Sequence, residues 1–331
     1  MVIFKNVSDI KGKLRRPVVT IGNFDGVHLG HREIFRRVRE LAREIGGVSV
    51  VITFVPHPLK VVAAHREVRL ITTSREKEAL IEGSGIDYLL EIPFDKAFAS
   101  IPAAEFVQRV LVDAIGLERL VIGYDYAFGR GREGDVGLLR ELGTRFGYSV
   151  EELQPISDGS TVYSSTGVRR LVSAGDVSGA SLLLGRHFSV TGKVVHGHER
   201  GRSLGFPTAN IETEKDLIPS VGVYAVKVCL GDRLLDGACN VGPNPTFGND
   251  RLSIEVFLLD FDGDLYEREI TLFFIERLRG EKRFASLDEL KTAIAADVER
   301  CREILREARP VASESGGDWD CIARPSAGTP Q

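Results

Sequence analysis

The first half of the chain alternates short β-branched runs with segments that carry one apolar face, and this alternation limits the folds open to it. The runs are VVTI, VSVVITF, YLLEI, RLVIG and YSVEEL, at 18–21, 48–54, 88–92, 119–123 and 148–153. After the first run, apolar residues recur every three or four positions from Ile34 to Ile45, as on a helix that packs on a sheet. The pattern predicts an α/β domain of β-α-β units on a parallel sheet.

The pattern changes near residue 188. From 188 to 278, apolar and polar residues alternate in short runs between turn residues, which predicts a small antiparallel barrel or sandwich. Ser286, with Glu289 three residues later, predicts the start of a final helix that runs towards Arg306. We expect domains over 1–186 and 187–309, and a disordered tail over 310–331, which is small, polar and unpatterned.

Charge and hydropathy exclude several classes of protein. The 43 basic and 47 acidic residues leave a net charge of −4, so no overall positive field favours nucleic acid, and any phosphate site must be built locally. The longest apolar stretch, 48–55, is far short of the roughly 20 residues that span a bilayer. The four cysteines lack zinc-type spacing. We expect a cytoplasmic protein without a membrane segment, and its oligomeric state stays open.

The loop after the first strand is the first candidate site. It reads Gly22, Asn23, Phe24, Asp25, Gly26, Val27, His28, Leu29, Gly30, His31 and leads directly into the amphipathic helix. Backbone N–H groups at such a junction converge on an anion. The i, i+3 spacing of His28 and His31 places both imidazoles on one face, where they can bind a phosphate whose charge grows during transfer. The alternative is that the glycines only turn the chain and the histidines are exposed helix residues.

Three later segments of the first domain fit the same site. His57 and Pro58 follow the second strand, and Asp125 and Phe128 lie in a glycine-, aromatic- and arginine-rich segment that can stack a planar ring and meet a phosphate. A further helix opens with three hydroxyls and an arginine, which suit a triphosphate: Ser164, Ser165, Thr166 and Arg169. An ordinary N-cap with a surface arginine is the alternative for this last group.

The second domain carries its own candidate site in the segment 192–210. Its glycines and basic residues can wrap phosphates: Gly192, Lys193, Arg200, Gly201 and Arg202. After Pro207, the oxygens of Thr208 and Asn210 lie on one side of a short strand and suit a magnesium ion shared with ATP. A solvated basic hairpin is the alternative.

Asn240 and Glu255, farther along the chain, complete this second candidate site. Asn240 opens a rigid turn, and Glu255 lies in a strand on the face opposite Ile254, Val256 and Leu258. Beside magnesium and ATP, the Glu255 carboxylate can accept a proton from an alcohol nucleophile. A lone carboxylate of this kind can equally be an outward-facing strand residue.

The His-x-Gly-His form at the first β-α junction resembles the class I nucleotidyltransferases, and no KMSKS-like sequence supports a synthetase. As a whole, the chain from about Val18 to Arg306 resembles the prokaryotic bifunctional riboflavin kinase/FAD synthetase family (RibF type). The resemblance is carried by TIGNFDGVHLGH, PHP, GYDYAFGRGREGDV, SST, RGRSLGFPTAN, NVGPNPTFG and EVFLLDFDGDLYEREI, at 20–31, 56–58, 123–136, 164–166, 200–210, 240–248 and 255–270.

This resemblance implies a Rossmann-like domain over 1–186 that adenylylates FMN to FAD, and a β-barrel domain with a C-terminal helix over 187–309 that phosphorylates riboflavin. Riboflavin, FMN, FAD, ATP and ADP would be the ligands, with Mg²⁺ as cofactor and no nucleic acid or membrane partner. His28 and His31 would act on the ATP phosphates, and Gly22 to Asp25, Gly30 and the Ser164–Arg169 group would bind the nucleotide. His57, Pro58, Asp125 and Phe128 would contact the flavin. In the kinase, Gly192, Lys193, Arg200 to Arg202, Pro207 and Asn240 would bind ATP, Thr208 and Asn210 the metal, and Glu255 would be the general base.

The chain differs from the family pattern at Tyr163, where isoleucine is usual, and at Gly167, where arginine commonly follows SST. Two alternatives therefore stand beside the bifunctional enzyme. One is an active riboflavin kinase with an impaired N-terminal half, and the other is a binding protein that senses flavin or nucleotide without turning it over.

Overall fold

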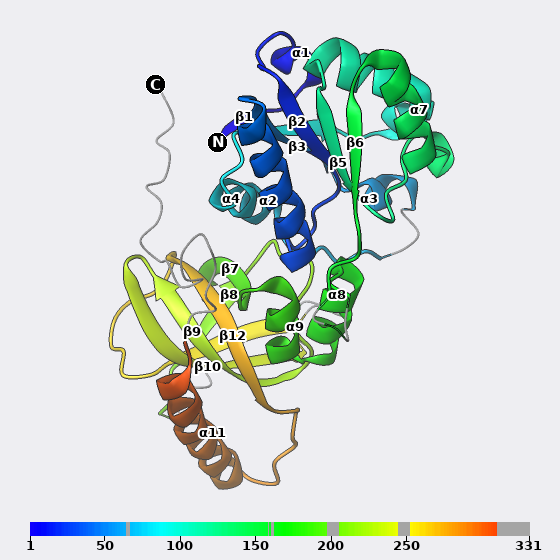
Figure 1. The fold of residues 1–331 in the computed structure, drawn as a ribbon. Helices are drawn as coiled ribbons and strands as arrows, with labels where there is room; N and C mark the ends of the chain where they lie inside the picture. Colours follow the sequence, from blue (N-terminus) through cyan, green and yellow to red (C-terminus); the bar gives the residue numbers. More distant parts are fainter. Residues whose placement is uncertain (64–66, 158, 160–161, 197–204, 244–251, 310–331) are drawn as a thin grey trace. The chain divides into compact units, whose positions relative to one another are not determined.

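A computed structural model describes residues 1–63, 67–157, 159, 162–196, 205–243 and 252–309. The chain forms two compact units, 1–165 and 166–331 (Figure 1). The predicted helix that opens with Ser164, Ser165 and Thr166 therefore begins at the boundary of the two units.

The first unit is built on a six-stranded sheet in which every pair of neighbours is parallel. Its strand order is β1-β4-β3-β2-β5-β6. The strands are β1 (Val2–Phe4), β2 (Pro17–Ile21), β3 (Val48–Val55), β4 (Tyr88–Pro93), β5 (Arg119–Gly123) and β6 (Ser149–Leu153). The predicted parallel sheet is confirmed, and only the three-residue β1 lies outside the predicted runs, because so short a strand leaves no periodic pattern.

Helices cover both faces of this sheet, so its strands are buried on two sides. Val19 and Ile21 of β2 face one apolar cluster, while Val18 faces another that includes Val38 and Leu41 of α2 (Leu29–Glu44). The remaining helices of the unit are α1 (Val7–Ile10), α3 (Pro58–Val62), α4 (Ser74–Gly83), α5 (Lys96–Ala99), α6 (Ala103–Phe106), the π-helix η1 (Val107–Ile115), the 3-10 helix η2 (Arg130–Arg132) and α7 (Val136–Phe146). Burial on both faces explains why the strands read as nearly continuous apolar runs.

The strand order reverses at β2, which pairs with β3 on one side and β5 on the other. In open parallel sheets, ligands bind in the crevice at such a reversal, outside the carboxyl ends of the strands. The segments that leave β2 and β5 begin at Gly22 and Tyr124. The topology therefore brings two of the predicted ligand-binding loops to the same edge of the sheet.

The second unit contains a closed antiparallel barrel in the order β10-β11-β8-β7-β12-β9 (Figure 1). This confirms the predicted barrel and decides against a sandwich. Its elements are α8 (Ser165–Ala174), which begins at the unit boundary, α9 (Val177–Leu184), β7 (Phe188–Val195), β8 (Ala209–Glu212), β9 (Gly222–Leu230), β10 (Arg233–Pro243), β11 (Leu252–Leu258), β12 (Glu269–Arg279) and α11 (Leu287–Glu307).

The predicted start of the final helix is also confirmed. The Ser286 hydroxyl accepts a hydrogen bond from the Glu289 amide at 3.2 Å, and α11 buries Val298, Cys301 and Leu305. Among the described residues, no helix combines the length and apolar character needed to cross a membrane. In the same residues, no cluster of three or more His, Cys, Asp or Glu side chains is placed to hold a metal ion.

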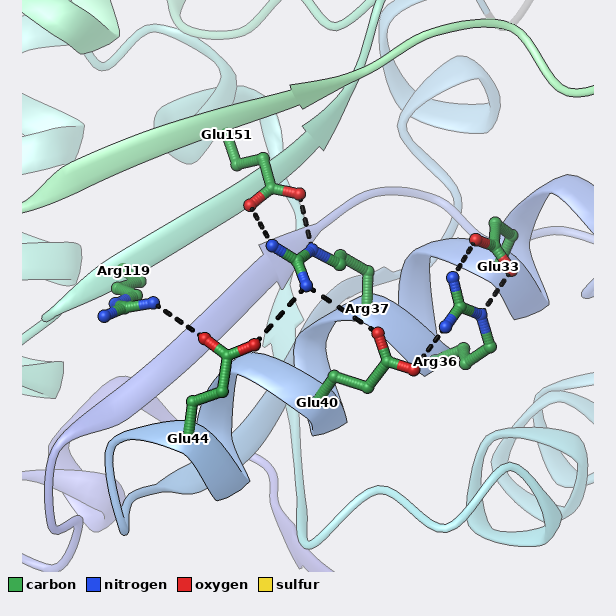
Figure 2. A network of polar contacts seen from close by, with 7 residues as sticks. All are labelled: Glu33, Arg36, Arg37, Glu40, Glu44, Arg119 and Glu151. Carbon is green, nitrogen blue, oxygen red and sulfur yellow. Dashed lines mark hydrogen bonds and ion pairs between the residues drawn. The ribbon is translucent and has the colours of Figure 1, made fainter.

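Helix α2 is held against the sheet by a network of ion pairs as well as by its apolar face (Figure 2). Arg37 binds the Glu151 carboxylate of β6 through two hydrogen bonds of 2.6 and 2.9 Å. Glu44 lies 3.6 Å from Arg37 and 3.4 Å from Arg119 of β5. By contrast, Arg36 pairs with Glu33 and Glu40 of its own helix. Among the described ion pairs of α2, those of Arg37 and Glu44 therefore reach β5 and β6.

We expect Arg37→Met to lower the free energy of unfolding by about 0.5–1 kcal/mol, because a half-buried bidentate pair between helix and sheet is lost. Arg36→Met is the matched control and should cost only a few tenths of a kcal/mol, since its pairs lie within one helix. Urea unfolding of both variants, at low salt and in about 1 M salt, measures the difference, which salt should reduce. Equal losses for the two variants would contradict a special role for Arg37.

Candidate functional site

The turn between β2 and α2 has an unusual backbone. Phe24, Gly26 and Val27 have φ of +49°, +86° and +40°. Positive φ is expensive for a non-glycine residue, above all a β-branched one, at about 1–3 kcal/mol each, and persists only where surrounding contacts hold it. The Gly22 amide extends the sheet ladder by donating to the Ile52 carbonyl at 3.1 Å. The turn is therefore strained, and its first residue, Gly22, is held by a hydrogen bond to β3.

Asp25 holds the middle of this turn. Its carboxylate, in a residue only 5% exposed, accepts hydrogen bonds from the amides of Ile71 and Thr72 at 3.0 and 3.1 Å. The Thr72 hydroxyl lies 3.2 Å from the same carboxylate and accepts from the Gly26 amide at 3.1 Å. The Asp25 carbonyl accepts from the Ser165 hydroxyl at 2.8 Å. The structure thus gives Asp25 a framework role, and its contact with a nucleotide stays a prediction.

The two histidines of the turn lie together at the start of α2. The His28 and His31 rings stack with centroids 3.6 Å apart and planes 24° apart. The Phe24 ring packs edge-on against His31, with centroids 5.1 Å apart. A Cβ at Gly30 would lie 3.1 Å from the His28 ring, so a glycine allows this close packing. The strained turn therefore delivers two stacked imidazoles to a helix N-terminus, where partial positive charge favours anions.

The predicted flavin-binding residues of the first unit differ in their exposure to solvent. His57 Nδ1 accepts from the Leu59 amide at 3.2 Å and caps α3, in which Pro58 is the first residue. Asp125 is exposed just beyond β5. Phe128 is only 8% exposed and packs in the core against Phe106 and Tyr126. Phe128 consequently supports the loop, and its contact with a flavin stays a prediction.

The predicted triphosphate-binding residues lie at the start of α8. Ser164 directly precedes the helix, Ser165 and Thr166 begin it, and Arg169 lies one turn farther along. Thr166 is exposed, and the other three are partly exposed. The predicted hydroxyl-rich helix start is therefore present, while its function stays a prediction.

On the barrel, three strands bring four predicted residues into one cluster. Glu255 of β11 is paired in register with Asn240 of β10 and with Asn210 of β8. The Thr208 hydroxyl donates to the Glu255 carboxylate at 3.4 Å. Cross-strand pairs share one face of a sheet, and the flanking Ile254 and Val256 are buried on the other. We call Thr208, Asn210, Asn240 and Glu255 the Glu255 cluster.

Of the remaining predicted kinase residues, the structure describes Gly192, Lys193 and Pro207. A Cβ at Gly192 would lie 2.3 Å from the Glu212 carbonyl, so the glycine permits β7 and β8 to approach. Lys193 forms an ion pair with Glu267, and Pro207 is exposed next to Thr208. Arg200, Gly201 and Arg202 lie outside the described residues.

The sequence reasoning missed the residues that hold the first turn. Thr72 anchors Asp25 and Gly26, and the buried Thr53 hydroxyl donates to the Asn23 carbonyl at 3.2 Å. Thr53 did carry a signal, because it is a polar residue near the end of a mostly apolar strand. Thr72 carried none, since its role depends on a contact between segments 46 residues apart.

We expect Asp25→Ala to lower the free energy of unfolding by about 1–3 kcal/mol, because two buried amides lose their acceptor. Asp135→Ala is the control, since this exposed N-cap residue accepts the Leu138 amide and its loss should cost about 1 kcal/mol or less. Urea unfolding compares the two. A smaller loss for Asp25→Ala than for Asp135→Ala would contradict the framework role.

Comparison with known proteins gives concordant results for the two halves. A family model described as FAD synthetase matches residues 10–167, and one described as riboflavin kinase matches residues 184–305. A solved structure titled macrolide-efflux protein, from Streptococcus pneumoniae, is similar with a TM-score of 0.82 and 32% identity, over 91% of this chain and 98% of that one. That title names a different activity, and the likeness supports the fold.

Two bacterial relatives carry the name bifunctional riboflavin kinase/FMN adenylyltransferase. The protein from Escherichia coli (strain K12) is 41% identical over 294 residues, which are 88% of this chain and 94% of the relative. The protein from Pseudomonas fluorescens is 41% identical over 305 residues, which are 92% and 98% of the two chains. With both family models in the same order along the sequence, this chain belongs to the family of bifunctional riboflavin kinase/FMN adenylyltransferases.

Proposed function

We propose that the protein makes FMN from riboflavin and ATP, and then FAD from FMN and a second ATP. The observation that carries the proposal is that one chain holds both the stacked histidines at the β2–α2 junction and the Glu255 cluster on the barrel. We assign FMN adenylylation to residues 1–186 and riboflavin phosphorylation to residues 187–309. We also propose that the protein is cytoplasmic.

In the adenylyltransferase, an oxygen of the FMN phosphate attacks the α-phosphorus of ATP. The bond from that phosphorus to the bridging oxygen breaks, and pyrophosphate leaves without a covalent enzyme intermediate. His28 and His31 stabilise the charge that develops on the transferring phosphate, and the backbone N–H groups at the start of α2 add to this stabilisation. Ser164, Ser165, Thr166 and Arg169 hold the triphosphate and the departing pyrophosphate.

In the kinase, Glu255 accepts the proton of the riboflavin 5′-hydroxyl while that oxygen attacks the γ-phosphorus of ATP and ADP leaves. The cross-strand neighbours Asn210 and Asn240 fix the strand position of Glu255, and Thr208 donates to its carboxylate at 3.4 Å.

The Glu255 cluster also fits a magnesium ion. Thr208 and Asn210 offer neutral oxygen donors beside one carboxylate, the hard ligands that suit Mg²⁺ when it keeps several waters and shares ATP phosphates. We propose that Thr208 and Asn210 hold the ion. When bound, it supplies charge neutralisation for the phosphates.

We expect Glu255→Gln to reduce FMN formation from riboflavin and ATP by about 100-fold or more, because the general base is lost while its shape is kept. FAD formation from supplied FMN should stay within about twofold of the wild-type rate. Glu212→Gln, an exposed carboxylate two residues from Asn210, is the control and should leave both rates unchanged. Chromatography of the flavin products measures both reactions. Wild-type FMN formation by Glu255→Gln would remove Glu255 from the mechanism.

For His31→Ala we expect the opposite pattern. FAD and pyrophosphate formation from FMN and ATP should fall by about 100-fold, and riboflavin phosphorylation should be unaffected. Glu33→Ala, on the same helix and paired with Arg36, is the control and should leave both rates unchanged. Pyrophosphate release at the wild-type rate in His31→Ala would show that the stacked histidines do not act on the phosphates.

A further inference from the structure

Lys77 of α4 is a buried lysine that lies outside every motif discussed above. It is only 8% exposed, and its amine donates a hydrogen bond to the Thr53 hydroxyl at 3.0 Å. It precedes the fully buried Ile81 by four residues, so it shares the buried face of the helix. Lysine is rarely buried to this extent without a specific partner, so the contact with Thr53 needs an explanation.

Thr53 also contacts the turn after β2. Its hydroxyl lies 3.2 Å from the Asn23 carbonyl, which can only accept a hydrogen bond. A hydroxyl has one hydrogen, so Thr53 donates it to Asn23 and accepts from Lys77. The two hydrogen bonds therefore run in one direction, from the Lys77 amine to the Thr53 hydroxyl and from that hydroxyl to the Asn23 carbonyl. We call these three residues the relay.

The surroundings of Lys77 are charged as well as buried. Glu91 of β4 is the register partner of Thr53, and one of its oxygens has no hydrogen-bond partner among the described residues. Lys5 pairs with Glu91 and with Glu78. Burial lowers the pKa of the Lys77 amine, and the negative charges of Glu91, Asp25 and Glu78 oppose that shift. Lys77 can donate to Thr53 in either protonation state.

The relay ends where the turn is strained. Asn23 directly precedes Phe24, whose φ is +49° and whose ring packs edge-on against His31. Asp25 holds the turn after Phe24, and the relay holds it before Phe24. We propose that Lys77 is a positioning residue of the adenylyltransferase, which acts through Thr53 and Phe24 to set the place of His31. The inference rests on the proposed FMN adenylylation.

A pair of Thr53 variants tests the relay without disturbing the buried charges. Thr53→Val keeps the shape of the side chain and removes both hydrogen bonds, whereas Thr53→Ser keeps the hydroxyl. We expect Thr53→Val to lower the kcat for FAD formation about tenfold and to raise the KM for ATP. Thr53→Ser should stay within about twofold of wild type. A merely structural loss would reduce the amount of active enzyme, and hence the apparent kcat, but would leave the KM for ATP unchanged.

Lys77→Met should show the same change in kcat and KM as Thr53→Val. The double variant should be no worse than the worse single one, because both break one relay. Lys77→Met/Glu91→Gln removes both buried charges, and we expect it to keep the defect in FAD formation even where it recovers thermal stability. Riboflavin phosphorylation is the internal control and should be unchanged throughout.

Three results would overturn the inference: wild-type kcat and KM in Thr53→Val, equal defects in Thr53→Ser and Thr53→Val, or losses that multiply in the double variant. If Lys77→Met does not fold, as judged by circular dichroism, the Thr53 pair decides alone. Absence of FAD formation by the wild-type protein would instead refute the proposed function, so the two failures are distinguishable.

Discussion

The buried hydrogen bonds of Asp25 hold the turn that carries His28 and His31. Two residues with side chains, Phe24 and Val27, adopt positive φ within the turn between β2 and α2, a conformation that persists only where surrounding contacts hold it. Asp25 offsets this cost by accepting the amides of Ile71 and Thr72 in a buried place, where unmade bonds would be expensive. The stacked histidines follow from that anchored turn.

The barrel reaches a comparable arrangement by other means. In its Glu255 cluster, the register of β10, β11 and β8 places Asn240, Glu255 and Asn210 side by side. The seven paired positions of β10 and β11 make that register difficult to shift, since a slip of one residue would turn Glu255 inward and a buried apolar residue outward. One half of the chain therefore depends on tertiary hydrogen bonds, and the other on strand register.

Much of the fold could be predicted from periodicity, and less of the site. The parallel sheet, the barrel and the Ser286 cap each have a local pattern, and all three are confirmed. The sequence predicted the chemistry of Thr208 and Glu255 but not their contact, because they lie 47 positions apart and no spacing pattern links them. The roles of Thr72 and Lys77 were hidden for the same reason. Phe128 shows the converse, since an aromatic residue in a glycine-rich loop turned out to pack in the core.

We propose that one chain performs two consecutive reactions, a phosphoryl transfer to riboflavin and an adenylyl transfer to FMN. Quantification of all products after riboflavin, excess ATP and Mg²⁺ are mixed with the full-length protein measures both reactions. If the proposal is right, ADP equals the sum of FMN and FAD formed, and pyrophosphate equals FAD alone. Accumulation of FMN with neither FAD nor pyrophosphate would contradict it, as would binding of riboflavin and ATP without any product.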